Sequence, residues 1–158
     1  MLRFSRLSLL FILTVAGFLG FLTSEDTVAV ASRPNDLSLE TTIIWANYTD
    51  WDNDGAYDDT YYILDLDFSG TSSNGIVIID IYLELLYPSG TVANGHIRIS
   101  VYAVDQTITI YCLDSVTETG WYTVTITTVL VGSGGGPDVS VSSYLFDPPT
   151  GKGNGLPQ

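Results

Sequence analysis

Apolar and polar residues alternate with a period of two along almost every segment between Leu39 and Phe146, and this pattern limits the fold more than any other feature of the sequence. For example, Leu83 and Leu85 alternate with Tyr82 and Glu84. Successive side chains of a strand point to opposite faces, so a strand with this pattern buries one face and exposes the other. No segment of this region has a sustained helical period. We therefore expect an all-β domain.

Turn-forming residues divide the region into seven short strands. The expected strands contain residues 39–47, 64–68, 77–85, 97–103, 108–112, 122–126 and 139–141. The separating segments are rich in Gly, Pro, Asn and Ser, and lie at 69–75, Pro88-Ser89-Gly90, Asn94-Gly95, 118–120 and 132–137. Seven short strands at this spacing predict a single β-sandwich.

Residues 1–31 have the three parts of an export signal. Arg3 and Arg6 precede a 16-residue apolar run at 7–22, and the small-x-small triplet 29–31 predicts cleavage before Ser32. The run is shorter than the roughly 20 residues that span a bilayer comfortably. A retained membrane anchor at 7–22 and a pilin-type assembly helix remain open as alternatives, although no Gly or Ala precedes the run. Each alternative predicts an extracellular or cell-surface protein.

The remaining chain is expected to form one domain at 32–147 and a short tail. The tail, 148–158, is rich in Pro and Gly and is predicted to be disordered. The single cysteine, Cys112, excludes an internal disulfide. It shares the inward parity of Ile108 and Ile110, so we expect a buried, unreactive thiol.

Acidic residues dominate the charge of the chain. Lys and Arg number 5 and Asp and Glu number 18, giving a formal net charge of -13. This charge argues against a nucleic-acid partner. The composition resembles that of archaeal secreted proteins from salty habitats. A cell-surface protein whose Asp residues gather around one ion site is the alternative.

Five carboxylates lie within ten residues in the loop 50–59, between the first two expected strands. Two like charges about 4 Å apart repel by on the order of 4 kcal/mol at an effective dielectric constant near 20, so such a cluster calls for a counter-ion. The spacing Asp-x-Asp-x-Asp-Gly-x-x-Asp offers oxygens at loop positions 1, 3, 5 and 9, and Gly55 permits a sharp turn. The loop therefore predicts a Ca²⁺ site, with a solvated acidic turn and a Mg²⁺ or Mn²⁺ site as alternatives.

This loop resembles the calcium loops of integrin-type propeller repeats, thrombospondin-type repeats and dockerins, which share Asp-x-Asp-x-Asp-Gly. The resemblance implies as ligands Asp50, Asp52, Asp54, Ala56 and Asp58. Loop position 12 is Tyr61 instead of a bidentate Glu, so Asp59 or a carboxylate distant in sequence is expected to supply the remaining oxygen. Without position 12 we expect a dissociation constant of roughly 10⁻⁴ to 10⁻³ M.

Residues Glu118, Gly120, Tyr122 and Val124 match the pattern Asp-x-Gly-x-Tyr-x-Cys with two substitutions. Through them, residues 38–147 resemble the immunoglobulin-like family. The resemblance is greatest to the disulfide-free domains of prokaryotic surface proteins, and of archaeal ones in particular. The resemblance implies that Tyr122 forms the tyrosine corner before the sixth strand. Glu118 stands in place of the Asp and Val124 in place of the disulfide Cys. The resemblance bears on fold and not on function.

The sequence has no Ser-His-Asp order, Gly-x-Ser-x-Gly elbow, His-rich metal cluster or cysteine nucleophile site, which removes most hydrolase and redox mechanisms. The only histidine, His96, follows the expected Asn94-Gly95 turn and is expected to be exposed. We expect a non-catalytic module that binds a cell-surface or extracellular protein or a glycan. One alternative is a structural subunit of a filament or sheath, which self-associates through its N-terminal segment or a strand edge. The other is a sugar-binding module, suggested by Trp51 and Tyr57 in the loop.

Overall fold

The computed structural model describes residues 11–15, 37–70, 75–131 and 138–147. All regular structure in these ranges is β: β1 (Phe11–Val15), β2 (Ser38–Thr49), β3 (Asp59–Ser69), β4 (Ile76–Leu86), β5 (Val92–Tyr102), β6 (Gln106–Cys112), β7 (Tyr122–Val131) and β8 (Asp138–Phe146). Within the described residues no helix has the length and apolar character needed to cross a membrane. The seven strands expected from the sequence all form, as β2 to β8. Apart from 11–15, the predicted export segment 1–31 lies outside the described residues, as does the predicted tail 148–158.

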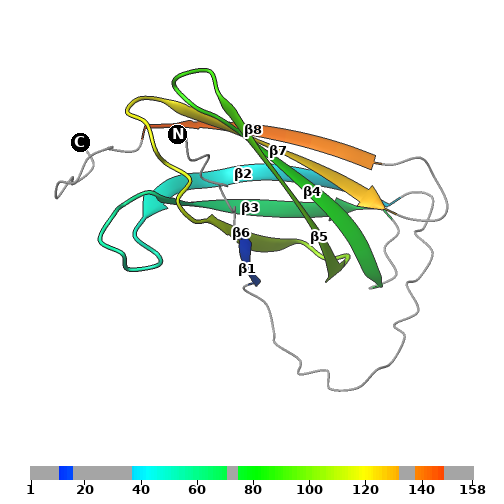
Figure 1. The fold of residues 1–158 in the computed structure, drawn as a ribbon. Coiled ribbons are helices and arrows are strands. Elements are labelled where there is room, and N and C mark those ends of the chain that lie inside the picture. The colour runs from blue at the N-terminus through cyan, green and yellow to red at the C-terminus, as the bar shows by residue number, and fades with distance from the viewer. Residues whose placement is uncertain (1–10, 16–36, 71–74, 132–137, 148–158) are drawn as a thin grey trace, which may run out of the picture.

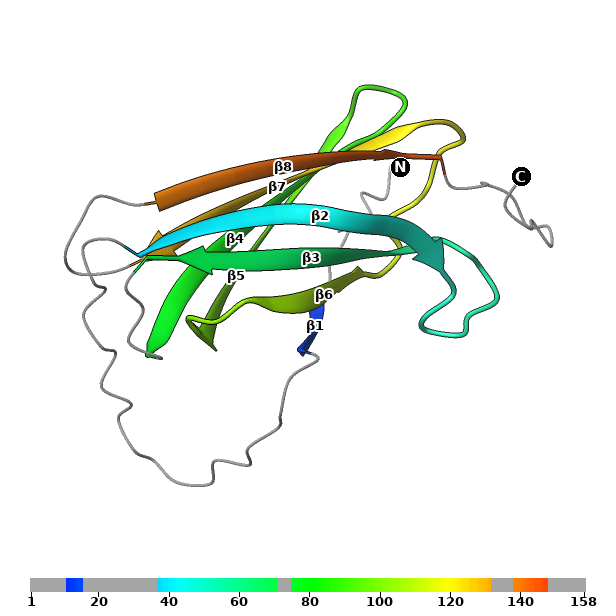
Figure 2. The ribbon, with the colours of Figure 1, turned by 180° about the vertical axis from the view of Figure 1, so that it is seen from behind.

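The strands form two antiparallel sheets that pack face to face (Figure 1; Figure 2 from behind). One sheet has the order β1-β6-β3-β2 and the other has the order β5-β4-β7-β8. Counting from β2, the first, second and fifth strands share a sheet, and the third, fourth, sixth and seventh share the other. The expected all-β sandwich is confirmed.

The core lies between the sheets and follows the predicted parity. On β7, for instance, buried and half-buried residues alternate without interruption from Tyr122 to Val131. The largest fully buried side chains are Tyr62, Tyr122, Leu37, Leu64, Leu66, Ile79, Ile81, Leu85, Ile108, Ile110, Ile126 and Leu130. Cys112 is also buried, and burial raises the pKa of its thiol to about 12. The expected burial of the thiol is confirmed, and its low reactivity stays a prediction.

The turn expected at Asn94-Gly95 is wrong, because both residues lie inside β5 and pair with β4. The chain reverses earlier, where the Tyr87 N–H donates to the Thr91 carbonyl and the Gly90 N–H donates to the Tyr87 carbonyl, both at 2.9 Å. Gly90 has a φ of 84°, which glycine adopts without strain. Two turn signals stood within a few residues of each other, and only one of them could reverse the chain while β4 and β5 kept their full register.

Tyr122 forms the corner that the sequence predicts. Its buried hydroxyl accepts the N–H of Glu118 at 2.7 Å and the N–H of Thr117 at 3.2 Å, and donates to the Glu118 carbonyl at 2.9 Å. These bonds tie the segment before β7 to the first residue of that strand. Gly120 lies in this segment with a φ of 120°, and a Cβ there would be 3.2 Å from the Cβ of Pro88. Glycine is therefore required at this position.

One side of the sandwich is closed by contacts between β2 and β8, which lie side by side in both views (Figures 1 and 2). Backbone N–H groups of β2 donate to side chains of β8: Leu39 to Asp138 Oδ2 at 2.7 Å, Thr41 to Ser140 Oγ at 2.9 Å and Ile43 to Ser142 Oγ at 3.0 Å. The donors advance along β2 as the acceptors advance along β8, so the two strands run parallel. Inside this seam the hydroxyls of Thr41 and Thr128 lie 2.7 Å apart in a buried hydrogen bond.

Candidate metal centre

The acidic loop joins the end of β2 to the start of β3 at one end of the sandwich (Figure 1, turquoise). Its own carboxylates hold its backbone: the Asp54 N–H donates to Asp52 Oδ1 at 3.1 Å, and the Ala56 N–H donates to Asp54 Oδ1 at 2.7 Å. Two residues have positive φ, Asn53 at 60° and Gly55 at 92°. These conformations suit Asn and Gly, which explains locally why this sequence turns here.

Asp59, the first residue of β3, holds the loop in place through hydrogen bonds to its side chain. Its side chain is fully buried. Oδ2 accepts the N–H groups of Trp51 at 2.6 Å and Asp52 at 3.2 Å, and Oδ1 accepts the N–H of Asp114 at 2.9 Å. A buried carboxylate with three backbone donors has its hydrogen-bonding needs met. Asp59 therefore connects the loop to the segment between β6 and β7.

That segment lies beside the loop because β3 pairs with β6, with Thr60 opposite Cys112. Residues just before position 60 consequently lie next to residues just after position 112. The Asp58 carbonyl accepts the N–H groups of Ser115 and Val116, each at 2.8 Å. This pairing brings the side chain of Asp114 to the acidic loop.

The carboxylates form two overlapping clusters. Single oxygens of Asp50, Asp52 and Asp54 all lie within 4.8 Å of one another, and so do single oxygens of Asp52, Asp59 and Asp114. The structure thus brings together four of the residues expected from the sequence and adds Asp114. The sequence left Asp59 and an unspecified distant carboxylate open as the source of the remaining oxygen, because it predicts the strands but not their pairing.

Two oxygens beside these clusters lack hydrogen-bond donors. Oδ1 of Asp50 and Oδ1 of Asp58 are buried and have no hydrogen-bond partner. Burial and then the neighbouring acids, led by Asp54, raise the pKa of Asp58. Burial and then Asp52, Asp59 and Asp54 raise the pKa of Asp114. A buried anionic oxygen without a donor is unfavourable, and a cation would stabilise it. The atoms that could bind a metal in these clusters are all carboxylate oxygens. Oxygen ligands suit a hard cation better than a transition metal that prefers nitrogen or sulfur.

Ala56 and the aromatic residues complete the loop. Ala56 donates its N–H to Asp54 Oδ1, and its role as a ligand stays a prediction. The Trp51 ring packs against Tyr111 with centroids 4.1 Å apart, and the Tyr57 ring meets Tyr48 edge-on at 6.5 Å. Both loop rings remain exposed, Trp51 by 42% and Tyr57 by 60%. The sugar-binding alternative would use these two rings, and a glycan array would test it.

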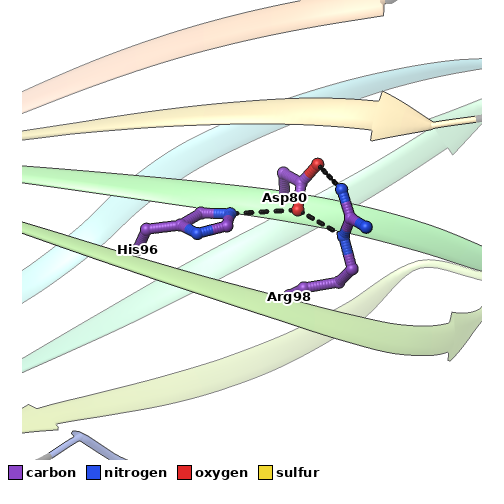
Figure 3. A network of polar contacts seen from close by, with 3 residues as sticks. All are labelled: Asp80, His96 and Arg98. Carbon is purple, nitrogen blue, oxygen red and sulfur yellow. Dashed lines mark hydrogen bonds and ion pairs between the residues drawn. The ribbon is translucent and has the colours of Figure 1, made fainter.

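A second polar cluster lies on the outer face of the other sheet (Figure 3). Asp80 on β4 is only 5% exposed. Arg98 donates to both of its oxygens, from Nε at 2.7 Å and from Nη2 at 2.6 Å, and Nε2 of His96 lies 3.0 Å from Oδ1. The hydrogen bond from Arg98 is the main cause that lowers the pKa of Asp80 to about 2. A carboxylate held ionised in this way is a poor proton donor at neutral pH. Its contacts with His96 and Arg98 tie β4 to β5.

His96 stacks on Tyr82 with ring centroids 4.5 Å apart. Its side chain is exposed by 47%, as expected, although it lies within β5 and not after a turn.

Comparison with known proteins identifies no family for this chain. No family model matches the sequence, and no curated protein matches it. Among solved structures, a beta-glucosidase from Kluyveromyces marxianus is similar over 72% of this chain, with 18% sequence identity and a TM-score of 0.45. The similar region spans 14% of that enzyme's chain. At this level the similarity carries no argument about fold or activity.

Proposed function

We propose that the protein is a non-catalytic extracellular β-sandwich module that binds Ca²⁺ in the 50–59 loop and serves in cell-surface interaction or adhesion. The observation that carries the proposal is a pair of buried carboxylate oxygens without a hydrogen-bond partner, one on Asp50 within the acidic clusters and one on Asp58 beside them. Their partner in the functional protein is a cation.

The ligands would come from two connections. Asp50, Asp52, Asp54 and Asp58 lie in the loop, and Asp114 after β6 would supply the oxygen that the loop lacks at position 12. Asp59 would orient the others through its three backbone donors. Calcium accepts six to eight oxygens in irregular geometry, whereas Mg²⁺ requires a near-ideal octahedron. A flexible loop rich in carboxylates therefore favours calcium.

A bound ion would fix the β2–β3 loop to the β6–β7 connection. With a dissociation constant of roughly 10⁻⁴ to 10⁻³ M, 10 mM free calcium would stabilise the fold by about 1.4 to 2.7 kcal/mol, from RT ln(1 + [L]/Kd). This end of the sandwich would then present a rigid surface to a protein or glycan partner outside the cell.

The proposal includes that residues 38–147 form an immunoglobulin-like domain of a surface protein. The corner at Tyr122 and the seven-strand sandwich support it. The leader-like pattern of residues 1–31 supports export, and the net charge of -13 supports an archaeal, saline habitat.

The test replaces two ligands and compares the result with an equal change of charge elsewhere. Asp52→Asn with Asp54→Asn should lower the melting temperature in 10 mM Ca²⁺ and not in chelator. The control, Glu40→Gln with Asp67→Asn, alters two acids that pair across β2 and β3 away from the loop. It should change the melting temperature equally in both conditions. An equal loss by the loop variant with and without calcium would refute the proposal.

A further inference from the structure

The end of β2 carries a sequence motif that the proposed function does not use. Asn47-Tyr48-Thr49 is an acceptor sequence for N-linked glycosylation, Asn-x-Thr with a residue other than proline between the two. It occurs once, because no other Asn of the chain is followed two positions later by Ser or Thr. Such a motif has a meaning only in an exported protein, and only where the structure leaves the Asn within reach of solvent.

Asn47 lies on the outer face of its sheet. Ala46, just before it, is buried opposite Tyr62, so strand alternation directs Asn47 and its partner Tyr61 away from the core. The Asn47 side chain is half-buried. Its Oδ1 accepts the N–H of Tyr48 at 2.9 Å, whereas Nδ2 has no hydrogen-bond partner among the described residues. The atom that an N-linked sugar is attached to is therefore the one that the fold leaves free.

An irregularity in β2 places a tryptophan beside this acceptor. The register with β3 shifts between Ile43 and Trp45, so Ile44 is an extra residue without a partner. Ile43 is buried, and in a regular strand Trp45 would point to the core as well. The bulge instead turns the Trp45 ring to the outer face, where it is 47% exposed. The ring and the Asn47 side chain thus share one face, two residues apart.

The surroundings of Asn47 suit a neutral sugar ring. Tyr61 lies opposite Asn47, and Ile63 lies opposite Trp45, so four uncharged residues form this part of the face. A pyranose ring has an apolar C–H face that can pack on an aromatic ring while its hydroxyls remain in water. Residues two apart on a strand are separated by about 7 Å, and directly opposed residues by about 5 Å. A sugar on Nδ2 is therefore within reach of both aromatic rings.

We infer that Asn47 is glycosylated in the exported protein and that the first sugar of its oligosaccharide packs on Trp45 and Tyr61. In the transfer, a bond forms between Nδ2 and the anomeric carbon of an oligosaccharide carried on a polyprenyl phosphate. The bond from that carbon to the carrier phosphate breaks, the phosphate leaves with the electron pair, and Nδ2 loses a proton. The inference rests on the export in the proposed function but not on calcium binding.

The first experiment expresses the full chain in a eukaryotic host that N-glycosylates exported proteins. The intact mass of the exported chain should exceed that of the polypeptide by an oligosaccharide, and an amidase that releases N-linked glycans should remove the excess. Asn47→Gln and Thr49→Ala should each abolish the added mass, whereas Thr49→Ser, which keeps the motif, should retain it. Asn94→Gln, at an exposed Asn of β5 outside any such motif, is the matched control and should retain it too.

A second experiment tests the contact with the aromatic rings. The melting temperature is compared before and after release of the glycan, in wild type, in Trp45→Ala and in Trp121→Ala. We expect the glycan to raise the melting temperature of wild type, and the rise to fall by at least half in Trp45→Ala. Trp121 is 60% exposed and lies next to β7 of the other sheet, so its replacement should leave the rise unchanged.

The outcomes separate this inference from the proposed function. An exported chain without added mass would overturn glycosylation at Asn47, and an equal rise in wild type and Trp45→Ala would overturn the packing of the sugar on that ring. A chain that stays inside the host would refute export, and the inference with it. Calcium-dependent melting is read separately, so none of these results decides the metal site.

Discussion

Replacement of Asp80 by Asn removes the charge at the centre of the Asp80–Arg98–His96 cluster with little change of shape. The pKa of Asp80 is lowered from 3.8 to about 2. A difference of about 1.8 units at 1.36 kcal/mol each corresponds to about 2.4 kcal/mol. The Arg98 side chain is 60% exposed, so solvent screening reduces the expected contribution to about 1 to 2 kcal/mol. Asp80→Asn should destabilise the protein by this amount at pH 7.

The pH dependence follows from the direction of the shift. Because the folded pKa lies below the unfolded one, the contribution is fully present above about pH 4 and is lost as the pH falls through about 2. Urea unfolding of wild type and variant between pH 7 and pH 2 would measure it. Glu84→Gln, at an exposed carboxylate on the same strand, is the control and should change stability by less than about 0.5 kcal/mol. No destabilisation at pH 7, or a difference that is constant with pH, would refute the reasoning.

Three further predictions concern single residues. Tyr122→Phe removes the hydroxyl that bonds to Thr117 and Glu118. Urea unfolding should therefore show that the free energy of unfolding falls by about 1 to 3 kcal/mol. A fall below about 0.5 kcal/mol would contradict the role of the corner. Asp114→Asn should reduce the calcium-induced rise in melting temperature by at least half. In chelator its melting temperature should be equal or higher, because one like charge is removed. An unchanged rise in calorimetry would exclude Asp114 as a ligand. Cys112 should react with a thiol reagent at pH 8 only after unfolding, because burial raises its pKa to about 12; fast labelling of the native protein would contradict this.

The sequence predicts the sandwich well because strand side chains alternate regardless of partner. Ile108 and Ile110 are buried where their parity places them, and Tyr122 makes the corner bonds that its motif implies. The strand boundary at Asn94-Gly95 is wrong, because a local turn signal yields to the pairing of β5 with β4 along its whole length.

The candidate site is predicted only where it is local. Asp50, Asp52 and Asp54 converge because a short loop with Gly55 holds them together. Asp114 joins them through the pairing of β3 with β6, and no pattern within a single strand specifies which strand it pairs with. For the same reason, the position of Arg98 across from Asp80 could not be predicted from the sequence.

The calcium site is the central claim, and thermal unfolding of the full chain tests it most directly. The melting temperature is compared in 10 mM Ca²⁺, in 10 mM Mg²⁺ and in chelator at fixed ionic strength, because a charge of -13 responds to salt alone. A stabilisation of about 1.4 to 2.7 kcal/mol predicts a rise of roughly 5 to 10 °C with calcium over chelator, and a smaller rise with magnesium. An equal rise with both ions, or none with either, would contradict a calcium site in this loop.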